Sequence, residues 1–389
     1  MVVAKNKAYV ASVGFTRIGD RWESSLLDLA VEAGKRALEG IPGLKPQQLF
    51  VGNMFSSVAA SQEHLGALLA NSLGLTGIPA MKVESACSSS ASAFNIAYSM
   101  VRSGAIDSAL VVGVEKMRDL EGETVSKALC MAESAEWTQF IGATFAALNA
   151  LLARRYIDEM NVTRDELSAI PVIDHDNGVT AEHAQFRKAI SPEVVARSAM
   201  IAEPLRLFDC APTGDGAAAA VIVNDNAASN PKAKLVEILG GGVRTAEFSV
   251  YQRKDMLRFG ATEEAFKVAT DMAGISPKKL AFAEIHDAFS ATGALSLEAM
   301  GFSKRGEAAR DAVSGKYNLN SDISINTFGG LKARGHPVGG TGLYQISEAY
   351  LQLTDRAGKN QVRDADFGVT QNVGGVDTTS GVHVFGRAS

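Results

Sequence analysis

A repeated pattern is the feature of this sequence that most constrains its fold. Residues 43–56 read GLKPQQLFVGNMFS, and residues 274–290 read GISPKKLAFAEIHDAFS. Three pairs of positions match at a constant offset of 231 residues: Gly43 and Gly274, Pro46 and Pro277, Leu49 and Leu280. Each stretch follows an amphipathic helix and leads into an apolar strand. Convergence of two α/β segments on similar turns would give the same matches, but the order of elements also agrees, which favours a duplicated domain.

The domain boundaries follow from this repeat. Apolar strand-like runs such as SALVVGV and AAAAVIVND alternate with helical patterns, as expected of an α/β protein. Residues 120–199 are less regular and richer in charge, which is typical of an inserted lid or substrate-binding layer. We therefore expect residues 1–119 and 200–230 to form one half, residues 120–199 the inserted domain, and residues 231–389 the other half.

Composition excludes several classes of function. A net charge of −5 and a pI near 5.8 argue against binding to nucleic acid or an anionic membrane. Three widely spaced cysteines indicate a reducing compartment and no disulfide scaffold. The chain has neither an apolar run long enough for a membrane span nor the apolar core of a signal peptide. We expect a cytoplasmic protein.

One of these cysteines is placed as a nucleophile would be. Cys87 lies in ESACSSSAS, between the short segment MKVES and a helical pattern. A position near a helix N-terminus favours the thiolate and is expected to lower the pKa of the thiol. The small neighbours would let the helix be buried and leave room for an acyl group on sulfur. A buried packing role for Cys87 is the alternative.

Two histidines could act with this cysteine. His336 lies in the glycine-rich segment TFGGLKARGHPVGGTG, where Pro337 fixes a turn before a helix, and His286 directly follows an apolar strand in EIHDAFS. A cysteine and two histidines supply a nucleophile, a base and a donor for a carbonyl oxygen.

At these residues the sequence resembles the thiolase family nearly end to end. The matching blocks are ESACSSSA, VVGVEKM, GDGAAAA, HDAF and GGLKARGHPVGGTG. The resemblance implies a thiolase fold: two duplicated βαβαβαββ halves that form a five-layered α-β-α-β-α core with an inserted loop domain. It also implies that Cys87 is acylated by an acyl-CoA and that His336 activates Cys87 and holds the thioester carbonyl.

The sequence departs from the common thiolase pattern at two places. His286 replaces the asparagine of the usual NEAF segment, and the C-terminal stretch TQNVGGVD has Asn372 and Gly374 where a second catalytic cysteine is usual. We expect Gly374 to contribute to an oxyanion hole with the Cys87 N–H, and Asn372 and Gly340 to lie near the substrate. Another group must then remove the α-proton: His286 is the first candidate, and His336 and Cys130 are weaker ones.

The combination of HDAF and NVGGVD resembles archaeal acetoacetyl-CoA thiolases of the mevalonate route, and sterol-carrier-protein-type thiolases share part of it. This implies an acetyl-CoA C-acetyltransferase that makes acetoacetyl-CoA for isoprenoid synthesis and needs no resident cofactor. The resemblance also implies that the chain forms a homodimer or homotetramer. Further implied partners are hydroxymethylglutaryl-CoA synthase and a small zinc-ribbon/OB-fold protein. The alternatives are an acyltransferase acting on a longer acyl-CoA or a non-CoA acceptor, and a non-catalytic scaffold subunit.

Residues 174–188 contain further polar candidates. His175 and His183 match no metal-ligand spacing, so we expect a solvated loop and no metal site. Arg187 and Lys188 could contact the phosphates of coenzyme A or form surface charge pairs.

Overall fold

Ten strands form one continuous sheet in the computed structural model, which describes residues 6–228 and 233–388. Along the sheet the order is β10-β9-β11-β12-β8-β1-β7-β4-β2-β3, and a two-stranded sheet, β5-β6, lies apart from it. The strands are β1 (Ala8–Phe15), β2 (Gln48–Gly52), β3 (Ala80–Val83), β4 (Ser108–Glu115), β5 (Met200–Ala202), β6 (Leu205–Arg206), β7 (Gly216–Asn224), β8 (Val236–Thr245), β9 (Phe282–Glu284), β10 (Ser324–Ile325), β11 (Phe367–Gly374) and β12 (Thr379–Arg387).

The strand order shows the duplication directly. Read outward from the middle, β1-β7-β4-β2-β3 in one half mirrors β8-β12-β11-β9-β10 in the other. The halves join where β1 and β8 pair antiparallel, through Tyr9 with Glu237 and Val10 with Val236. The repeat seen in the sequence occupies equivalent turns, because Gly43 and Gly274 both adopt left-handed backbone, with φ of 86° and 65°.

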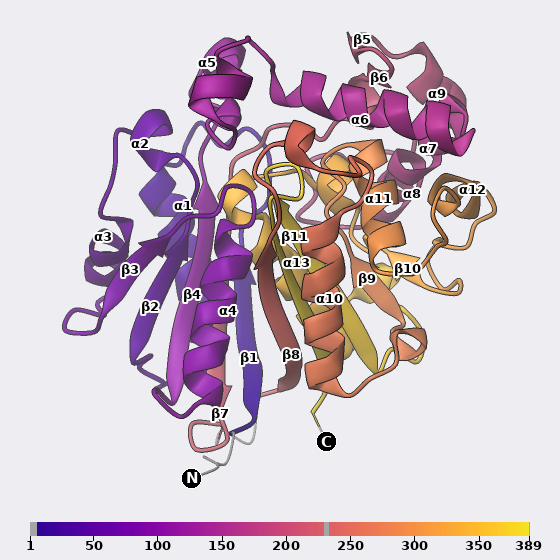
Figure 1. The fold of residues 1–389 in the computed structure, drawn as a ribbon. Coiled ribbons are helices and arrows are strands. Elements are labelled where there is room, and N and C mark those ends of the chain that lie inside the picture. Colours follow the sequence, from indigo (N-terminus) through magenta and orange to yellow (C-terminus); the bar gives the residue numbers. More distant parts are fainter. Residues whose placement is uncertain (1–5, 229–232, 389) are drawn as a thin grey trace.

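Helices complete the layers (Figure 1). Helices α4 (Ser89–Arg102) and α13 (Thr341–Leu353) each contact strands of both halves and form the layer between them. Helix α1 (Leu26–Glu39) covers the outer face of the first half, and α10 (Gly260–Ala273) covers that of the second. The remaining helices of the halves are α2 (Ser56–Ala59), α3 (Leu65–Ser72), α11 (Ser290–Ala299) and α12 (Ala308–Val313).

The local sequence explains where α1 begins and why one face of this helix packs against the sheet. The Ser25 hydroxyl accepts from the Asp28 N–H while the Asp28 carboxylate accepts from the Ser25 N–H, which is a capping box. Its apolar residues recur at helical spacing and are buried against the sheet. They are Leu26, Leu29, Ala30, Ala33 and Ala37.

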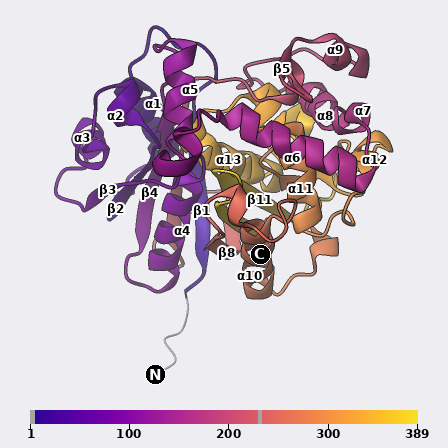
Figure 2. The same cartoon turned by 45° about the horizontal axis from the view of Figure 1, so that its top comes forward.

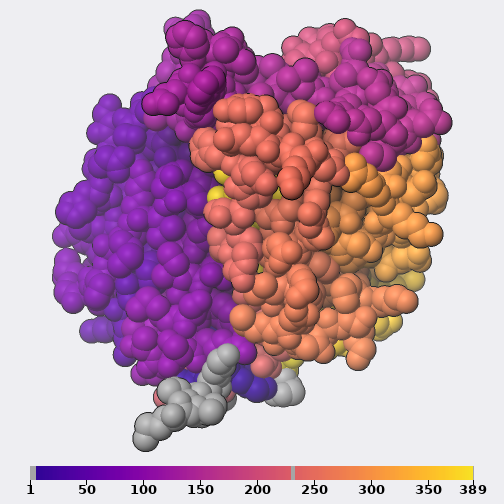
Figure 3. Space-filling model, viewed as in Figure 1, coloured from indigo at the N-terminus to yellow at the C-terminus, as the bar shows by residue number. Residues whose placement is uncertain are grey.

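The inserted segment lies across one end of the two halves (Figures 1 and 2). Its helices are α5 (Gly122–Cys130), α6 (Phe145–Met160), α7 (Arg164–Leu167), α8 (Ala169–Gly178) and α9 (Pro192–Arg197). The space-filling view shows this segment in magenta bridging the first and second halves (Figure 3). The expectation of a solvated loop around His175 is wrong, because α8 is helical and its His175 and Asp174 are buried.

Within the described residues, no helix combines the length and apolar character needed to cross a membrane.

Candidate active site

The cysteine singled out by the sequence lies at a strand-to-helix turn, as expected. Cys87 follows β3 and precedes α4, and the turn is made by Ala86, whose φ of 52° is left-handed. Cys87 is only 4% exposed and lines a cavity of about 980 Å³.

The electrostatics of Cys87 differ from the expectation. Burial, and to a smaller extent the negative charge of Glu115, raises the pKa of the thiol to about 12. The helix N-terminus does not overcome this desolvation, so the resting group is a neutral thiol. A base must therefore remove its proton when it reacts.

The small residues after Cys87 serve helix packing. Ser88, Ser89 and Ser90 are fully buried, and a Cβ at Gly52 or Gly113 would lie within 2.7 Å of Ser90 atoms. Ser88–Ser90 do not border the cavity. Their small size therefore lets α4 approach the sheet and α13 closely, and the space beside Cys87 is formed by other residues.

His336 is held in the tautomer that suits a base. Its Nδ1 lies 2.7 Å from the Thr341 hydroxyl, which itself donates to the Pro337 carbonyl at 3.0 Å. Since the single hydroxyl proton is used on Pro337, the Thr341 oxygen accepts from an Nδ1–H, and Nε2 keeps its lone pair. Burial holds the pKa of His336 well below its usual range, and His286 and Arg334 add to this.

His286 is held in the opposite tautomer. The Asn372 amide donates to its Nδ1 at 3.0 Å, so the ring proton lies on Nε2. Burial, and to a smaller extent the positive charge of Arg334, lowers the pKa of His286 to about 3. A neutral ring with a protonated Nε2 is a hydrogen-bond donor. The geometry thus opposes the base role expected for His286 and makes Asn372 the residue that orients it.

The two histidines contact each other. Their rings meet edge to face with centroids 5.2 Å apart. His336 borders the same cavity as Cys87, and His286 lies against His336 from the side of β9. The structure therefore brings together all three residues predicted from separate parts of the sequence.

The predicted glycines have different surroundings. A Cβ on Gly374 would lie 2.3 Å from the Ser85 carbonyl oxygen, so glycine is required for β11 to reach the turn that holds Cys87. The N–H of Gly340 instead donates to Pro337 at 2.9 Å. Gly340 therefore belongs to the internal turn before α13 and is not a substrate donor. Cys130 does not border the cavity, and its thiol faces the Ala143 carbonyl at 3.7 Å.

A buried carboxylate that the sequence did not single out ties the site together. Glu115 ends β4, and its oxygens accept from the N–H groups of Met54 at 2.9 Å and Gly339 at 3.1 Å and from the Asn53 amide at 2.8 Å. Through these hydrogen bonds, Glu115 connects the glycine-rich loop after His336 to the loop after β2. Burial raises the pKa of Glu115 and the backbone N–H donors lower it, which leaves the pKa at about 7. Glu115 lies within the VVGVEKM block, but that block does not reveal its role, because its hydrogen-bond partners are distant in sequence.

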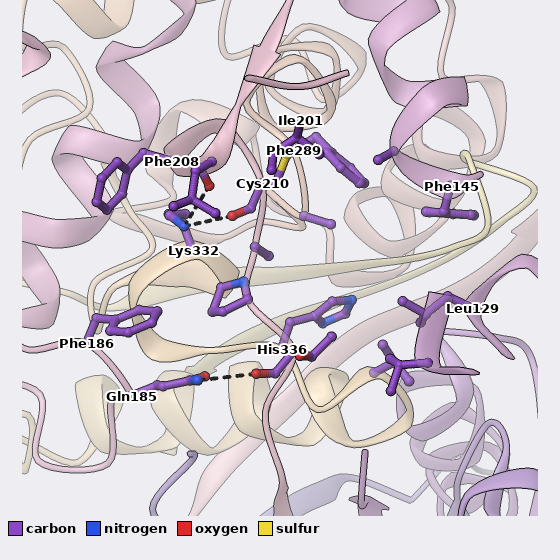
Figure 4. A pocket seen from close by; sticks show the side chains of 18 of the residues that line it. Leu129, Phe145, Gln185, Phe186, Ile201, Phe208, Cys210, Phe289, Lys332 and His336 are labelled. Carbon is purple, nitrogen blue, oxygen red and sulfur yellow. Dashed lines mark hydrogen bonds between the residues drawn. The ribbon is translucent and has the colours of Figure 1, made fainter. Parts of the chain in front are cut away.

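Two groups of side chains lie on opposite sides of His336 (Figure 4). Leu129 and Phe145 lie on one side, and Phe186, Phe208 and Lys332 lie on the other. Arg187 and Lys188, considered as contacts for coenzyme A, are exposed and border the cavity.

His183 lies elsewhere, in the core. Its Nε2 pairs with Glu348 at 2.8 Å, and its ring stacks on Tyr344. Among the described residues, no group of three or more His, Cys, Asp or Glu side chains is arranged to hold a metal ion.

Comparison with known proteins agrees with this architecture. Residues 8–226 match the family described as Thiolase, N-terminal domain, and residues 242–387 match Thiolase C-terminal domain-like. The chain belongs to the thiolase family. This thiolase is an acyltransferase with the fold of two duplicated halves and an inserted domain.

Its relatives include two archaeal proteins named acetyl-CoA acetyltransferase. The protein of Methanothermobacter thermautotrophicus is 38% identical over 380 residues, covering 97% of this chain and 99% of the relative. That of Methanocaldococcus jannaschii is 38% identical over 389 residues, covering 96% and 98%. Among solved structures, the Ltp2-ChsH2(DUF35) aldolase matches with a TM-score of 0.85 and 22% identity over 99% of both chains, which shows a shared fold.

Proposed function

We propose that this thiolase is an acetyl-CoA C-acetyltransferase, which condenses two acetyl-CoA molecules to acetoacetyl-CoA and coenzyme A. The observation that supports this most is the pair of histidines in opposite tautomers, one of which borders the cavity beside Cys87. The names of the archaeal relatives support acetyl-CoA as the substrate.

Acylation of Cys87 is the first half-reaction. The thiol proton passes to Nε2 of His336 as sulfur attacks the thioester carbonyl of acetyl-CoA. The bond from the carbonyl to the sulfur of coenzyme A then breaks, and the departing thiolate takes the proton from His336. The products are acetyl-Cys87 and coenzyme A, and His336 is neutral again.

Condensation can then reuse the same base. Nε2 of His336 takes the α-proton of the second acetyl-CoA, while the Nε2–H of His286 donates to the enolate oxygen. The enolate carbon attacks the acetyl carbonyl, the carbon–sulfur bond to Cys87 breaks, and the Cys87 thiolate takes the proton back from His336. We propose that this single-base cycle replaces the second cysteine, with the N–H groups of Cys87 and Gly374 facing the acyl oxygen.

The wider assignments rest on resemblance. We propose that the product enters the mevalonate route of isoprenoid synthesis in the cytoplasm. We also propose that coenzyme A thioesters are the substrates and that the enzyme needs no resident cofactor. We also propose a homo-oligomer that associates with hydroxymethylglutaryl-CoA synthase and a small zinc-ribbon/OB-fold protein. The solved aldolase named with ChsH2(DUF35), which has the same fold, supports a partner protein of some kind.

Mass spectrometry of the protein after incubation with acetyl-CoA tests the proposal. We expect a mass increase of one acetyl group on Cys87, absent in Cys87→Ala, followed by acetoacetyl-CoA in solution. Acylation without condensation, even with the proposed partners, favours a transferase using another acceptor. No acylation at all favours the scaffold alternative.

A further inference from the structure

A pair of buried carboxyl groups lies outside the cavity, next to the segments that carry the two histidines. Asp174 on α8 is fully buried, and Asp287, the residue after His286, is 3% exposed. Neither side chain borders the cavity. The two carboxyl groups lie within hydrogen-bonding reach of each other. Two ionised carboxylates would repel each other strongly in a place without water, so this contact requires a proton.

Asp287 connects the two histidine segments. Its Oδ1 accepts from the Leu331 N–H at 2.8 Å, and its Oδ2 accepts from the Lys332 N–H at 3.3 Å. Both N–H groups belong to the helical turn that leads to His336, whereas Asp287 itself adjoins His286. The Asp287 carboxylate therefore sets the position of one histidine segment relative to the other.

Asp174 reaches the same point from the inserted domain. Its Oδ1 accepts from the Asn326 amide at 3.0 Å, and the Asn326 Oδ1 accepts from the Ile285 N–H at 2.8 Å. Its Oδ2 has no hydrogen-bond donor among the described residues. A Cβ on Gly330 would lie 2.7 Å from Oδ1 of Asp174, and one on Gly329 would lie 3.0 Å from its carbonyl oxygen. The two glycines thus allow α8 to approach the turn before His336.

One proton between the two carboxyl groups satisfies both of them. Each oxygen of Asp287 accepts a backbone N–H, whereas Oδ2 of Asp174 lacks a partner, so the proton belongs on Asp174 and is donated to Asp287. Burial, and to a smaller extent the negative charge of Asp287, raises the pKa of Asp174 well above its usual range. Asp174 is therefore a neutral acid in the folded protein.

The charged groups around Asp174 agree with this protonation. Glu284 on β9 adds negative charge, and the Lys332 ammonium also interacts with Asp174. On α8 itself, Asp176 is exposed, and burial lowers the pKa of His175. The charged side chains of the other segments packed on α8 pair elsewhere: Arg164 with Asp209, Glu166 with Arg310, Glu298 with Tyr156, Asp311 with Lys316 and Arg334 with Glu348.

We infer that Asp174 is a positioning residue for the proposed reaction: as a neutral acid it donates to Asp287, and this hydrogen bond holds the segments of His286 and His336 in their reactive arrangement against the inserted domain. The inference rests on the proposed function for the roles of the two histidines. Asp174 acts through Asp287 and contacts neither the substrate nor the reacting atoms.

Thermal unfolding at several pH values detects the proton without turnover. Asp174→Asn keeps the shape, and its amide can donate to Asp287 at every pH. In wild type, the folded state keeps a proton that the unfolded chain releases above the usual aspartate pKa of 3.8, so stability falls as the pH rises. We expect the melting temperature of wild type to fall relative to Asp174→Asn by up to about 2 °C per pH unit between pH 5 and 7. The same difference at pH 5 and pH 7 would overturn the inference.

The single-turnover rate of Cys87 acetylation tests the positioning role. Asp174→Leu has a similar size but can neither accept from Asn326 nor donate to Asp287. We expect acetylation to slow by about tenfold, the effect of one buried hydrogen bond, while calorimetry shows the same affinity for coenzyme A, because Asp174 does not border the cavity. Asp174→Asn should restore most of the rate, and equal rates in the two variants would contradict positioning through Asp287.

Asp287→Asn is the matched variant on the other side of the hydrogen bond. Its amide has one acceptor atom, so the Lys332 N–H loses its partner, and we expect acetylation to slow by about tenfold although the size is unchanged. This comparison also serves if Asp174→Leu does not fold. Equal acetylation rates in Asp174→Asn and Asp287→Asn would overturn the assignment of the proton to Asp174.

The outcome is separable from that of the proposed function. Suppose that the difference in melting temperature widens with pH and that acetylation responds to Asp174→Leu, but that wild type forms no acetoacetyl-CoA. The positioning role would then stand and the proposed condensation would be wrong. Normal condensation in wild type and in Asp287→Asn would overturn the positioning role alone.

Discussion

Replacing Thr341 by valine tests whether the tautomer of His336 controls the reactivity of Cys87. Valine has nearly the same shape but no hydroxyl, so at this fully buried position it removes the acceptor for the His336 Nδ1–H and the donor to Pro337. The ring can then move its proton to Nε2, where it can no longer act as the base.

The hydrogen bonds give the size of the effect. Leaving a buried polar group unpaired costs about 1–3 kcal/mol, which corresponds to roughly a 5- to 150-fold smaller population of the reactive tautomer. We expect the single-turnover rate of Cys87 acetylation to fall by that factor, while the affinity for coenzyme A changes little because Thr341 does not border the cavity.

The assay is rapid-quench mass spectrometry of acetyl-Cys87, with calorimetry for coenzyme A. Thr341→Ser keeps the hydroxyl and serves as the control, with an expected rate within about threefold of wild type, since surroundings change only by one methyl group. Equal acylation rates in Thr341→Val and wild type would show that the tautomer is set by something other than Thr341, and would refute the reasoning.

Three further predictions follow from the site. His286→Phe keeps the ring but removes the donor, so Cys87 acetylation should survive while acetoacetyl-CoA formation falls by about 10²-fold; equal losses in both steps would contradict a donor role limited to condensation. Because the pKa of Cys87 is about 12, the thiolate fraction should rise about tenfold per pH unit between pH 7 and 10; iodoacetamide labelling of Cys87 that levels off below pH 9 would instead support a helix-stabilised thiolate. Gly374→Ala places a Cβ 2.3 Å from the Ser85 carbonyl, so we expect a lower melting temperature and little activity, and an unchanged melting temperature would show that β11 can move away from the turn.

Much of the architecture could be predicted from the sequence because it depends on local patterns. The offset between Gly43 and Gly274 reports equivalent left-handed turns, and the structure confirms the duplication. The positions of Cys87 after β3 and of His286 after β9 also followed from short-range strand and helix signals.

The electrostatics and long-range contacts could not be predicted in this way. The pKa of Cys87 is raised because surrounding elements exclude water and place Glu115 nearby, and neither effect is visible in ESACSSSAS. His175 looked like part of a polar loop because Asp174 and Asp176 flank it, whereas its burial depends on packing against Phe186 and Phe208. Tautomers depend on partners such as Thr341, which only the fold identifies.

The inner helix layer has a consequence for how such a site can arise. Helices α4 and α13 are equivalent in the two halves, and they meet closely at their N-terminal ends: the Leu343 N–H donates to the Ser90 hydroxyl at 3.2 Å, and a Cβ on Gly342 would lie 2.8 Å from the Ala91 nitrogen. Cys87 precedes one helix and His336 precedes the other. A symmetric pair of identical halves would present two copies of the same group at this meeting point. Once the halves share a single chain, each copy can change independently, so one specialises as nucleophile and the other as base, and neither half alone contains a complete reacting pair.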